Sequence, residues 1–320
     1  MADIARHAGV SLQTVSRVVR KQSNVSDSTR EKIMAAITAL DYEPDAAAQL
    51  LASGRSRSIG VINVGEIHFG MQQLFISIEA GARKTGKYVV SASAPENDTP
   101  ELIAALKYLR ARGVLATVVV TQNPTIIPVI ERADFSQGVL VISGRHHLSN
   151  FVTIGFDQVK GARDMTRHLL DSKHSILHVA GPLATQDAME RLAAYQEACK
   201  KAGVPARWVS ANGWSAEHGY QVGKEVDPIP DAVFAASDQL ALGYMRALHE
   251  RGHKAGSDYI IGGFDDIDSA QYLWPSLTTV QQNYSALADA VINTLNSIIE
   301  NRPVHSIEIP TSLIVRESAP

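Results

Sequence analysis

Cysteine is almost absent from this chain, with Cys199 the single example in 320 residues. One thiol cannot form an internal disulfide, so a packed core must hold the fold, as is usual in a reducing cytoplasm. No apolar run reaches the length of a membrane-spanning helix. The N-terminus also lacks the charged-then-apolar pattern of a secretory signal. We therefore expect a cytoplasmic protein with no membrane partner.

The sequence also lacks the common motifs of cofactor and metal chemistry. It has no Gly-rich phosphate loop, zinc-binding helix motif or nucleophile elbow. The glycines of "GGFDD" do not form the dinucleotide fingerprint, and the pair His146–His147 lacks further ligands at metal-binding spacing. We expect no cofactor, no metal and no enzyme activity. An enzyme on a doubly wound fold remains a rival hypothesis, which turnover of a bound molecule would revive.

Charge of one sign is not in great excess, because the formal net charge is -3. This balance excludes a wholly basic nucleic-acid coat but permits a small basic patch on an acidic carrier. Residues 1–60 hold eight Lys and Arg against six Asp and Glu, a surplus of two cations. The length allows two or three compact units.

Residues 1–44 predict three short helices with the spacing of a helix-turn-helix. Ala5 lets two helices approach, Gly9 permits the turn, and Val15 fills the angle between them. The outer face of the second helix then presents Leu12, Gln13, Ser16, Arg17 and Arg20. Such side chains suit a major groove, where an apolar group contacts a thymine methyl and Gln or Arg binds base edges. An ordinary surface helix with scattered cations would show the same residues.

From residue 59 onward, apolar runs alternate with amphipathic stretches. Helices are expected near 71–85, 100–112, 158–171, 186–202, 215–226, 238–251 and 284–300, with short strands between them. This alternation predicts an α/β body of parallel sheets with helices on both faces. We expect a head at 1–44, a short segment and polar linker at 45–58, and a two-lobed body at 59–320. The first lobe would hold about 59–152 plus 284–310, and the second about 153–283 plus 311–320.

Two such doubly wound lobes can close on a small molecule, as periplasmic binding proteins do. The predicted strand ends offer aromatic residues and a few polar groups, a mixture that suits a neutral sugar. Asp238 opens a helix, so it is either a helix cap or a ligand contact. The stripe Phe75, Ile78 and Ala82 is interpreted as a dimer face, although internal packing explains the same stripe.

The combined motifs resemble the lactose-repressor (LacI) family of transcription regulators across essentially the whole chain. They include "AGVSLQTVSRVV", "VSDSTREK", "AGPL", "NGWSAEHGY", "ASDQLALG" and "GGFDD" followed by "PSLTTVQQN", in the family's order. The resemblance implies a homodimeric repressor on a roughly palindromic operator DNA, controlled by a small-molecule sugar effector. The single Trp of "GWSAEHGY" resembles the galactoside-responsive branch more than the purine-responsive one.

Residue roles follow from the same resemblance. Leu12, Gln13 and Arg17 would contact bases, and Leu51, on a hinge helix within 45–58, would be an apolar wedge in the minor groove. The residues expected near phosphates are Ser11, Thr14, Ser16, Asn24, Val25 and Ser26. The residues expected in the sugar site are His68, Phe69, Met71, Phe156, Arg191, Trp214, Ser237, Asp265, Gln282 and Tyr284.

Several positions depart from the family pattern. Asp45 and Ala46 replace an asparagine and a basic residue, and Gly144 and Ser237 replace polar ligand contacts. The chain begins inside the first family helix, so a start upstream of Met1 is expected; without a terminal heptad helix we expect a dimer rather than a tetramer. The leading hypothesis is a repressor of a sugar-utilisation operon, released by a galactoside-type inducer. A sugar-binding protein with a vestigial head, or a corepressor-dependent regulator, remains the alternative.

Overall fold

The computed structural model describes residues 1–19, 24–42, 56–66, 69–96, 98–132, 138–142, 151–171 and 175–320. The chain forms two compact units, a head at Met1–Ser56 and a body at Arg57–Pro320. Most of the segment expected to contain the hinge helix lies outside the described residues, because these omit 43–55. Within the described part, no helix combines the length and the apolar character that crossing a membrane requires.

Three helices form the head: α1 (Ala2–Ala8), α2 (Leu12–Val19) and α3 (Asp27–Ala39). Gly9 ends α1 in the left-handed conformation, at φ 63°, where a side chain would be strained. The Oγ of Ser11 accepts a hydrogen bond from the backbone N–H of Thr14 and so caps α2.

The core of the head is small and fully apolar. Ile4, Val15 and Ile33 bring one buried side chain from each helix. Ile33, Ile37 and Leu40 recur on α3 at helical spacing, but Leu40 is 41% exposed. Ala36 is buried instead, because it follows Ile33 at helical spacing and faces the same core.

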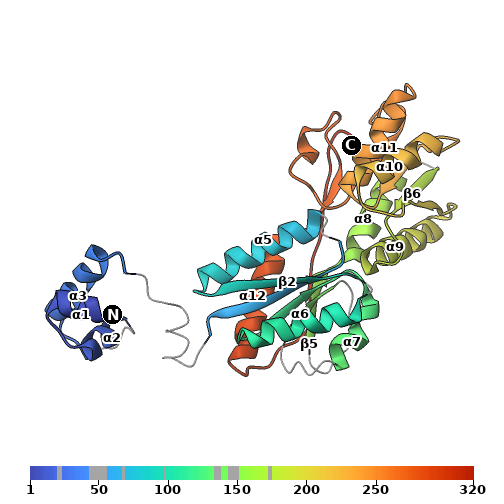
Figure 1. Ribbon diagram of the computed structural model, residues 1–320. Coiled ribbons are helices and arrows are strands. Elements are labelled where there is room, and N and C mark those ends of the chain that lie inside the picture. Colours follow the sequence, from blue (N-terminus) through green and yellow to red (C-terminus); the bar gives the residue numbers. More distant parts are fainter. Residues whose placement is uncertain are drawn as a thin grey trace. The chain divides into compact units, whose positions relative to one another are not determined.

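The first lobe of the body is a parallel six-stranded sheet between two layers of helices (Figure 1). Its strands lie in the order β11 (Ile307–Ile309), β5 (Phe151–Phe156), β4 (Gly138–Val141), β3 (Thr117–Val120), β1 (Ser58–Val64) and β2 (Tyr88–Ala94). Helices α5 (Phe69–Lys84) and α12 (Tyr284–Ile299) cover one face. The other face is covered by α6 (Thr99–Ala111), η1 (Pro124–Ile126) and α7 (Ile127–Arg132).

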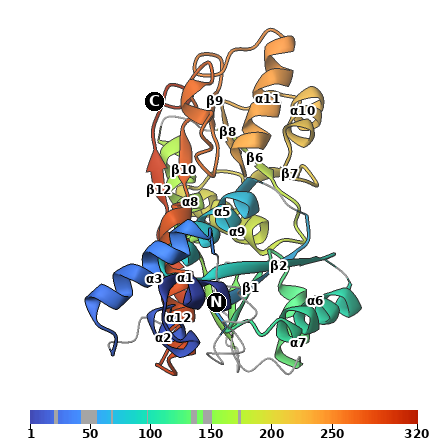
Figure 2. The same ribbon diagram turned by 60° about the vertical axis from the view of Figure 1, so that its left-hand side comes forward.

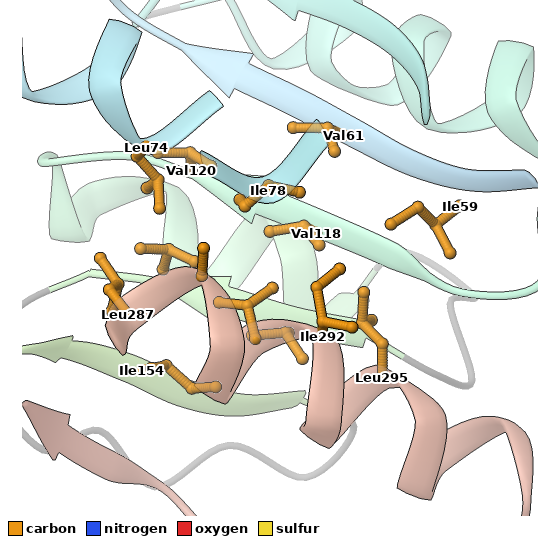
Figure 3. Packing of buried hydrophobic residues seen from close by; sticks show 14 of the residues in the cluster. Ile59, Val61, Leu74, Ile78, Val118, Val120, Ile154, Leu287, Ile292 and Leu295 are labelled. Carbon is orange, nitrogen blue, oxygen red and sulfur yellow. The ribbon is translucent and has the colours of Figure 1, made fainter. Parts of the chain in front are cut away.

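Every strand of this sheet except β2 and β11 is largely buried, which explains the continuous apolar runs in the sequence. Figure 3 shows side chains from β1 and β3 meeting Ile78 of α5 and Ile292 of α12 in one cluster. The core therefore joins segments that are about 200 residues apart along the chain.

The second lobe repeats the same layered arrangement. Its parallel sheet has the order β7 (Arg207–Ser210), β6 (Ile176–Ala180), β8 (Ala232–Ala235) and β9 (Ile260–Gly262). Helices α8 (Gln158–Leu170) and α9 (Gln186–Ala202) cover one face. Helices α10 (Ala216–Glu225) and α11 (Asp238–Glu250) cover the other face and lie side by side (Figure 2). A short ribbon of β10 (Thr279–Gln281) and β12 (Ser312–Ile314) and the turn η2 (Ala270–Tyr272) complete the lobe.

The chain crosses between the lobes after β5, after β10 and after β11. The sequence predicts that the first segment of the first lobe ends at about residue 152. In the structure, β5 pairs with β4 over Phe151–Ile154 and therefore belongs to the first sheet. The first crossing therefore lies at Asp157. The chain repeats strands on both sides of this point, so the alternation alone does not show which sheet β5 joins.

The stripe interpreted as a dimer face packs inside the first lobe. Ile78 and Ala82 are 0% exposed and belong to the core under α5. Phe75 is 38% exposed and its neighbour Ile76 is 58% exposed. The helical spacing identified a buried face correctly, but its contact is the sheet of the same lobe.

Helices α10 and α11 approach closely because glycines line their contact. A Cβ added to Gly243 would lie 1.7 Å from the carbonyl oxygen of Ala216, and one added to Gly219 would lie 2.1 Å from that of Leu240. Backbone atoms cannot rotate away as a side chain can, so a larger residue must push the two helices apart.

We expect Gly243→Ala to destabilise the body by roughly 1–3 kcal/mol or more, because overpacking against backbone strains the helix pair. Gly81→Ala is the matched control. The added Cβ there would meet only a side-chain atom of Ile292 at 3.1 Å. Thermal unfolding of both variants tests the prediction, and equal melting temperatures would contradict it.

Candidate functional site

The outer face of α2 is the exposed polar surface of the head. Leu12 is 53% exposed, and Gln13 and Arg17 are exposed beside it. Val15 and Val18, on the opposite face, are buried in the head core. The inner face therefore fixes the helix, while its outer face holds an apolar residue, an amide and a guanidinium free to contact a partner.

The polar residues predicted near phosphates lie at the starts of two helices. The hydroxyls of Ser11 and Thr14 are 2.8 Å apart at the start of α2, and those of Ser26 and Thr29 are 2.9 Å apart at the start of α3. Ser16 is half-buried on α2, and Asn24 and Val25 lie just before Ser26, the N-cap residue of α3. Helix starts favour anions. Leu51 lies outside the described residues.

A cavity of about 1000 Å³ opens between the two lobes of the body. The carboxyl ends of parallel strands from both sheets border it, which is the usual ligand position in such folds. Nine residues predicted from the sequence line this cleft: Phe69, Met71, Phe156, Arg191, Trp214, Ser237, Asp265, Gln282 and Tyr284. The tenth, His68, lies outside the described residues.

The guanidinium of Arg191 is the central charged group of the cleft. Its Nε donates to Oε1 of Gln158 at 2.9 Å, and its Nη1 donates to the carbonyl oxygen of Ala236. Its Nη2 lies 3.8 Å from Oδ1 of Asp265. The side chain is 3% exposed, so these contacts replace water around a buried cation.

Aromatic faces also hold the Arg191 side chain. Its Cζ lies 3.7 Å from the ring centre of Phe264 and 5.4 Å from that of Trp214. Cation–π contacts are stronger where water is excluded, as it is here. The position of Trp214 is fixed from behind, because a Cβ on Gly181 would come within 2.4 Å of the indole ring.

Asp265 faces Arg191 from a strained loop. Its φ is 114°, a conformation that side chains rarely adopt. Its Oδ1 accepts a hydrogen bond of 2.8 Å from Nε2 of Gln282. Burial raises the pKa of Asp265 to about 7, although Arg191 and Gln282 act in the opposite direction. Strain and a shifted carboxyl at one position are typical of a functional site.

The first lobe supplies an aromatic wall. The rings of Phe156 and Tyr284 meet edge to face at 5.2 Å between centres, and Phe69 meets Tyr284 at 6.5 Å. Burial raises the pKa of the Tyr284 hydroxyl well above its usual value, so the group is a neutral hydrogen-bond donor and acceptor.

Sequence reasoning missed a second carboxylate in the cleft. Oδ2 of Asp187 lies 3.9 Å from Nη2 of Arg191 and accepts a 2.9 Å hydrogen bond from Nε2 of Gln122. Gln122 follows β3, so this bond joins the first lobe to α9 of the second. The i,i+4 spacing of Asp187 and Arg191 on one helix was the signal that could have identified the pair.

Two predicted polar residues are mainly structural. Ser237 lines the cleft, but its Oγ caps α11 by accepting from the N–H of Leu240 at 3.2 Å. Asp238 is neither the cap nor a cleft residue, so both predicted roles are wrong. Its buried carboxyl accepts from Thr279 Oγ1 at 2.5 Å and from the N–H of Ile267 at 2.9 Å, because the loop after β9 passes directly over it.

The cleft therefore combines flat aromatic surfaces with forked donors and acceptors. The charge of Arg191 is opposed by Asp265 and Asp187, so an anionic ligand would meet two carboxylates beside one cation. A neutral molecule with several hydroxyl groups can contact both kinds of partner.

Comparison with known protein families gives two matches on this chain. Residues 1–45 match the lacI family of bacterial regulatory proteins, and residues 166–319 match the periplasmic binding protein-like domain. The first match covers the described helices of the head, and the second covers most of the second lobe together with α12 and β11 of the first.

Individual relatives match along nearly the whole chain. The lactose operon repressor of Escherichia coli strain K12 is 30% identical over 99% of this chain and 89% of its own length. The ribose operon repressor of Halalkalibacterium halodurans is 32% identical, over 99% of this chain and 96% of its own.

A solved structure, the lac repressor dimer bound to operator and the anti-inducer ONPF, superposes with a TM-score of 0.89. It is 29% identical and covers 99% of this chain and 98% of its own. Three findings indicate the same family: the helix-turn-helix head, the body of two parallel-sheet lobes, and the relatives that match along nearly the whole chain. The chain belongs to the lacI family of bacterial regulatory proteins, and it is a DNA-binding transcriptional repressor of that family.

Proposed function

We propose that the chain is a cytoplasmic homodimer that represses a sugar-utilisation operon and leaves its operator when a galactoside-type sugar binds in the cleft. The observation that carries this proposal is the buried Arg191–Asp265 pair between aromatic walls, in a body attached to a helix-turn-helix head. One chain therefore carries both a site suited to hydroxyl groups and an element suited to DNA.

Operator reading is assigned to α2 and its flanks. Leu12, Gln13 and Arg17 contact base edges, because they are the exposed groups on its outer face. The hydroxyls at the starts of α2 and α3 position the head on phosphates, and the lac repressor structure described above is itself bound to operator. The wedge role of Leu51 rests on the family resemblance.

Apolar residues on both lobes favour a homodimer. Ile76 of α5 and Tyr88 of β2 are 58% and 65% exposed on the first lobe, and Tyr272 and Trp274 are 80% and 93% exposed on the second. Large apolar groups in water are a common sign of a protein interface. A two-fold dimer presents two heads, as a palindromic operator requires.

The sugar is assigned to the cleft from its chemistry. Asp265 and Arg191 bind vicinal hydroxyls, while Trp214 and the Phe156–Tyr284 wall cover the C–H faces of a pyranose. The Escherichia coli relative is a lactose operon repressor and the H. halodurans relative a ribose operon repressor. Among such sugars, Trp214, the single Trp of the "GWSAEHGY" motif, favours a galactoside.

Release follows from a population shift. A sugar that contacts both lobes favours one lobe arrangement, and repression ends if the DNA-bound dimer prefers another. The bond between Gln122 and Asp187 joins the lobes beside the ligand and is sensitive to their spacing. A corepressor would use the same contacts with the opposite sign.

We expect Arg17→Ala to weaken binding to an operator, first selected with the parent protein from a random duplex library, by roughly 5- to 150-fold. This range corresponds to about 1–3 kcal/mol for one base contact. Sequence preference at the contacted base pair should also relax. Lys32→Ala, which removes an exposed cation from α3, is the matched control. Equal affinity of Arg17→Ala and the parent would contradict a base contact by Arg17, and a parent that selects no operator would instead support a sugar-binding protein with a vestigial head.

Galactosides should lower the affinity of the parent for its selected operator. The physical reason is the differential affinity of the sugar for the state that does not bind DNA. Operator titrations with a panel of neutral mono- and disaccharides measure the effect. Tighter DNA binding with sugar would identify a corepressor, and no change with any sugar would exclude this effector class.

Sugar affinity should depend on pH around neutrality. Asp265 accepts hydroxyl hydrogen bonds best as a carboxylate, and its pKa is raised to about 7. Affinity should therefore fall as pH decreases through 7, by up to about tenfold per unit below it. Calorimetric titration between pH 5.5 and 8.5 tests this, with Asp265→Asn expected to bind weakly and to lose the pH dependence. An unchanged profile in Asp265→Asn would assign the titration to another group.

Asp265→Asn should also change stability with a definite sign. The folded-state pKa of Asp265 is raised above its usual value, so the folded protein holds a proton that the unfolded chain loses. Stability from this group is present at low pH and is lost as pH rises towards 7. The melting temperature of Asp265→Asn relative to that of the parent should therefore be higher at pH 8 than at pH 5.

A further inference from the structure

The edge of the first sheet where its strands begin carries a row of cations. Arg57 directly precedes β1, and Lys87 directly precedes β2. Helices α5 and α6 end at this same edge, as Figure 1 shows, because each leads into the next strand. Their last turns and following residues add Arg83, Lys84, Arg110 and Arg112.

These side chains are open to solvent. All are exposed except Lys87, which is half-buried. Arg83 pairs with Glu79 one turn earlier, and Arg112 stacks on Tyr108 at 3.4 Å from the ring centre. Within the described part of the chain, Arg57, Lys84 and Lys87 form no ion pair.

Four acidic residues of this lobe lie at the opposite edge, whereas Glu79, Glu131 and Glu300 lie near the ends of helices that lead into strand starts. Glu66 follows β1, Glu96 follows β2, and Asp98 and Glu101 begin α6. Strand β1 has seven residues, so the two edges are roughly 23 Å apart. This distance exceeds the screening length of about 8 Å at physiological salt, so those four acids do not cancel the field of the basic edge.

We propose that this basic edge, defined by Arg57, Arg83, Lys84, Lys87, Arg110 and Arg112, is a second DNA contact that binds duplex phosphates flanking the operator. The proposal rests on the proposed function for its DNA partner. The head is joined to the body at this edge, since the chain passes from Ser56 through Arg57 into β1. The covalent connection to the head therefore enters the body beside these cations.

Duplex DNA fits this surface better than a small anion does. The cations are distributed over the starts of two strands and the ends of two helices, and none of them lines the cleft between the lobes. A row of flexible cations suits a linear array of phosphates, which is bound without sequence preference. The contact raises affinity and salt dependence but leaves base selection to α2.

The test compares two triple variants with the parent in full-length protein. Arg57→Gln with Lys84→Gln and Lys87→Gln removes three cations from the basic edge. Lys200→Gln with Lys201→Gln and Lys224→Gln removes three exposed cations from the second lobe, with the same change in net charge. Thermal unfolding and sugar binding verify that both variants are folded.

Each protein is titrated with an operator selected by the parent, once as a short duplex holding only the site and once with flanking DNA on both sides. Each phosphate contact contributes about −0.9 to the slope of log affinity against log salt. The triple variant at Arg57, Lys84 and Lys87 is called the edge variant, and the other triple variant is called the second-lobe variant. A dimer of the edge variant lacks six cations, so its slope on the long duplex should be shallower than the parent's by about 2 to 5. The gain in affinity from flanking DNA should shrink in this variant alone.

Identical slopes and identical flanking gains in the edge variant and the second-lobe variant would overturn the proposal while leaving operator binding intact. Equal losses in both variants would also overturn it, since they would indicate only the net charge. If the parent selects no duplex at all, the proposed function fails first, and this inference fails with it.

Discussion

The ligand cleft depends on the buried guanidinium of Arg191. A cation without water needs several partners at once, and here they come from α8, α9, the end of β8 and the loop after β9. Removing one member of such a set leaves the others buried and unpaired, which costs about 3–5 kcal/mol in comparable cases. The same contacts fix the floor of the cleft, which consists of Arg191 and the residues that contact it, and they leave the remaining donors and acceptors to a ligand.

This arrangement links recognition to lobe position. The floor around Arg191 belongs to the second lobe, whereas Phe156 and Tyr284 lie at two of the three crossings between lobes. A molecule seated on the floor therefore touches the segments about which the lobes would move. Gln122 and Asp187 add a direct bond across the gap. In the proposed mechanism the ligand contacts and the crossings between the lobes are neighbours, so no long pathway between them is required.

The sequence was sufficient for the layered fold and for the composition of the cleft. Buried strands and amphipathic helices alternate with clear periods, and the family motifs located nine described cleft residues through their spacing. It was insufficient where the partner of a residue is distant. The sheet that β5 joins depends on pairing with β4, and the stripe through Ile78 does not reveal whether its contact is internal.

Polar residues show the same difficulty at the level of single side chains. Asp238 has the sequence position of a cap, yet its carboxyl is fixed by Thr279, which is 41 residues further along the chain. Asp265 was found through its motif, but its raised pKa results from burial that no local pattern reports. Local rules therefore predict elements well, while the environment of a charge needs the folded chain.

The late return of the chain to the first lobe has a consequence for synthesis on the ribosome. β1 to β5 are made first, but α12 and β11, which cover one face and one edge of their sheet, appear only after the central sheet of the second lobe. Until then the face later covered by Leu287, Val291 and Leu295 stays open to water. The second lobe can form its central sheet earlier, from nearly contiguous residues. The lobe that leads in sequence thus stays incomplete until almost the whole chain has been made, and its open apolar face exposes the nascent protein to aggregation.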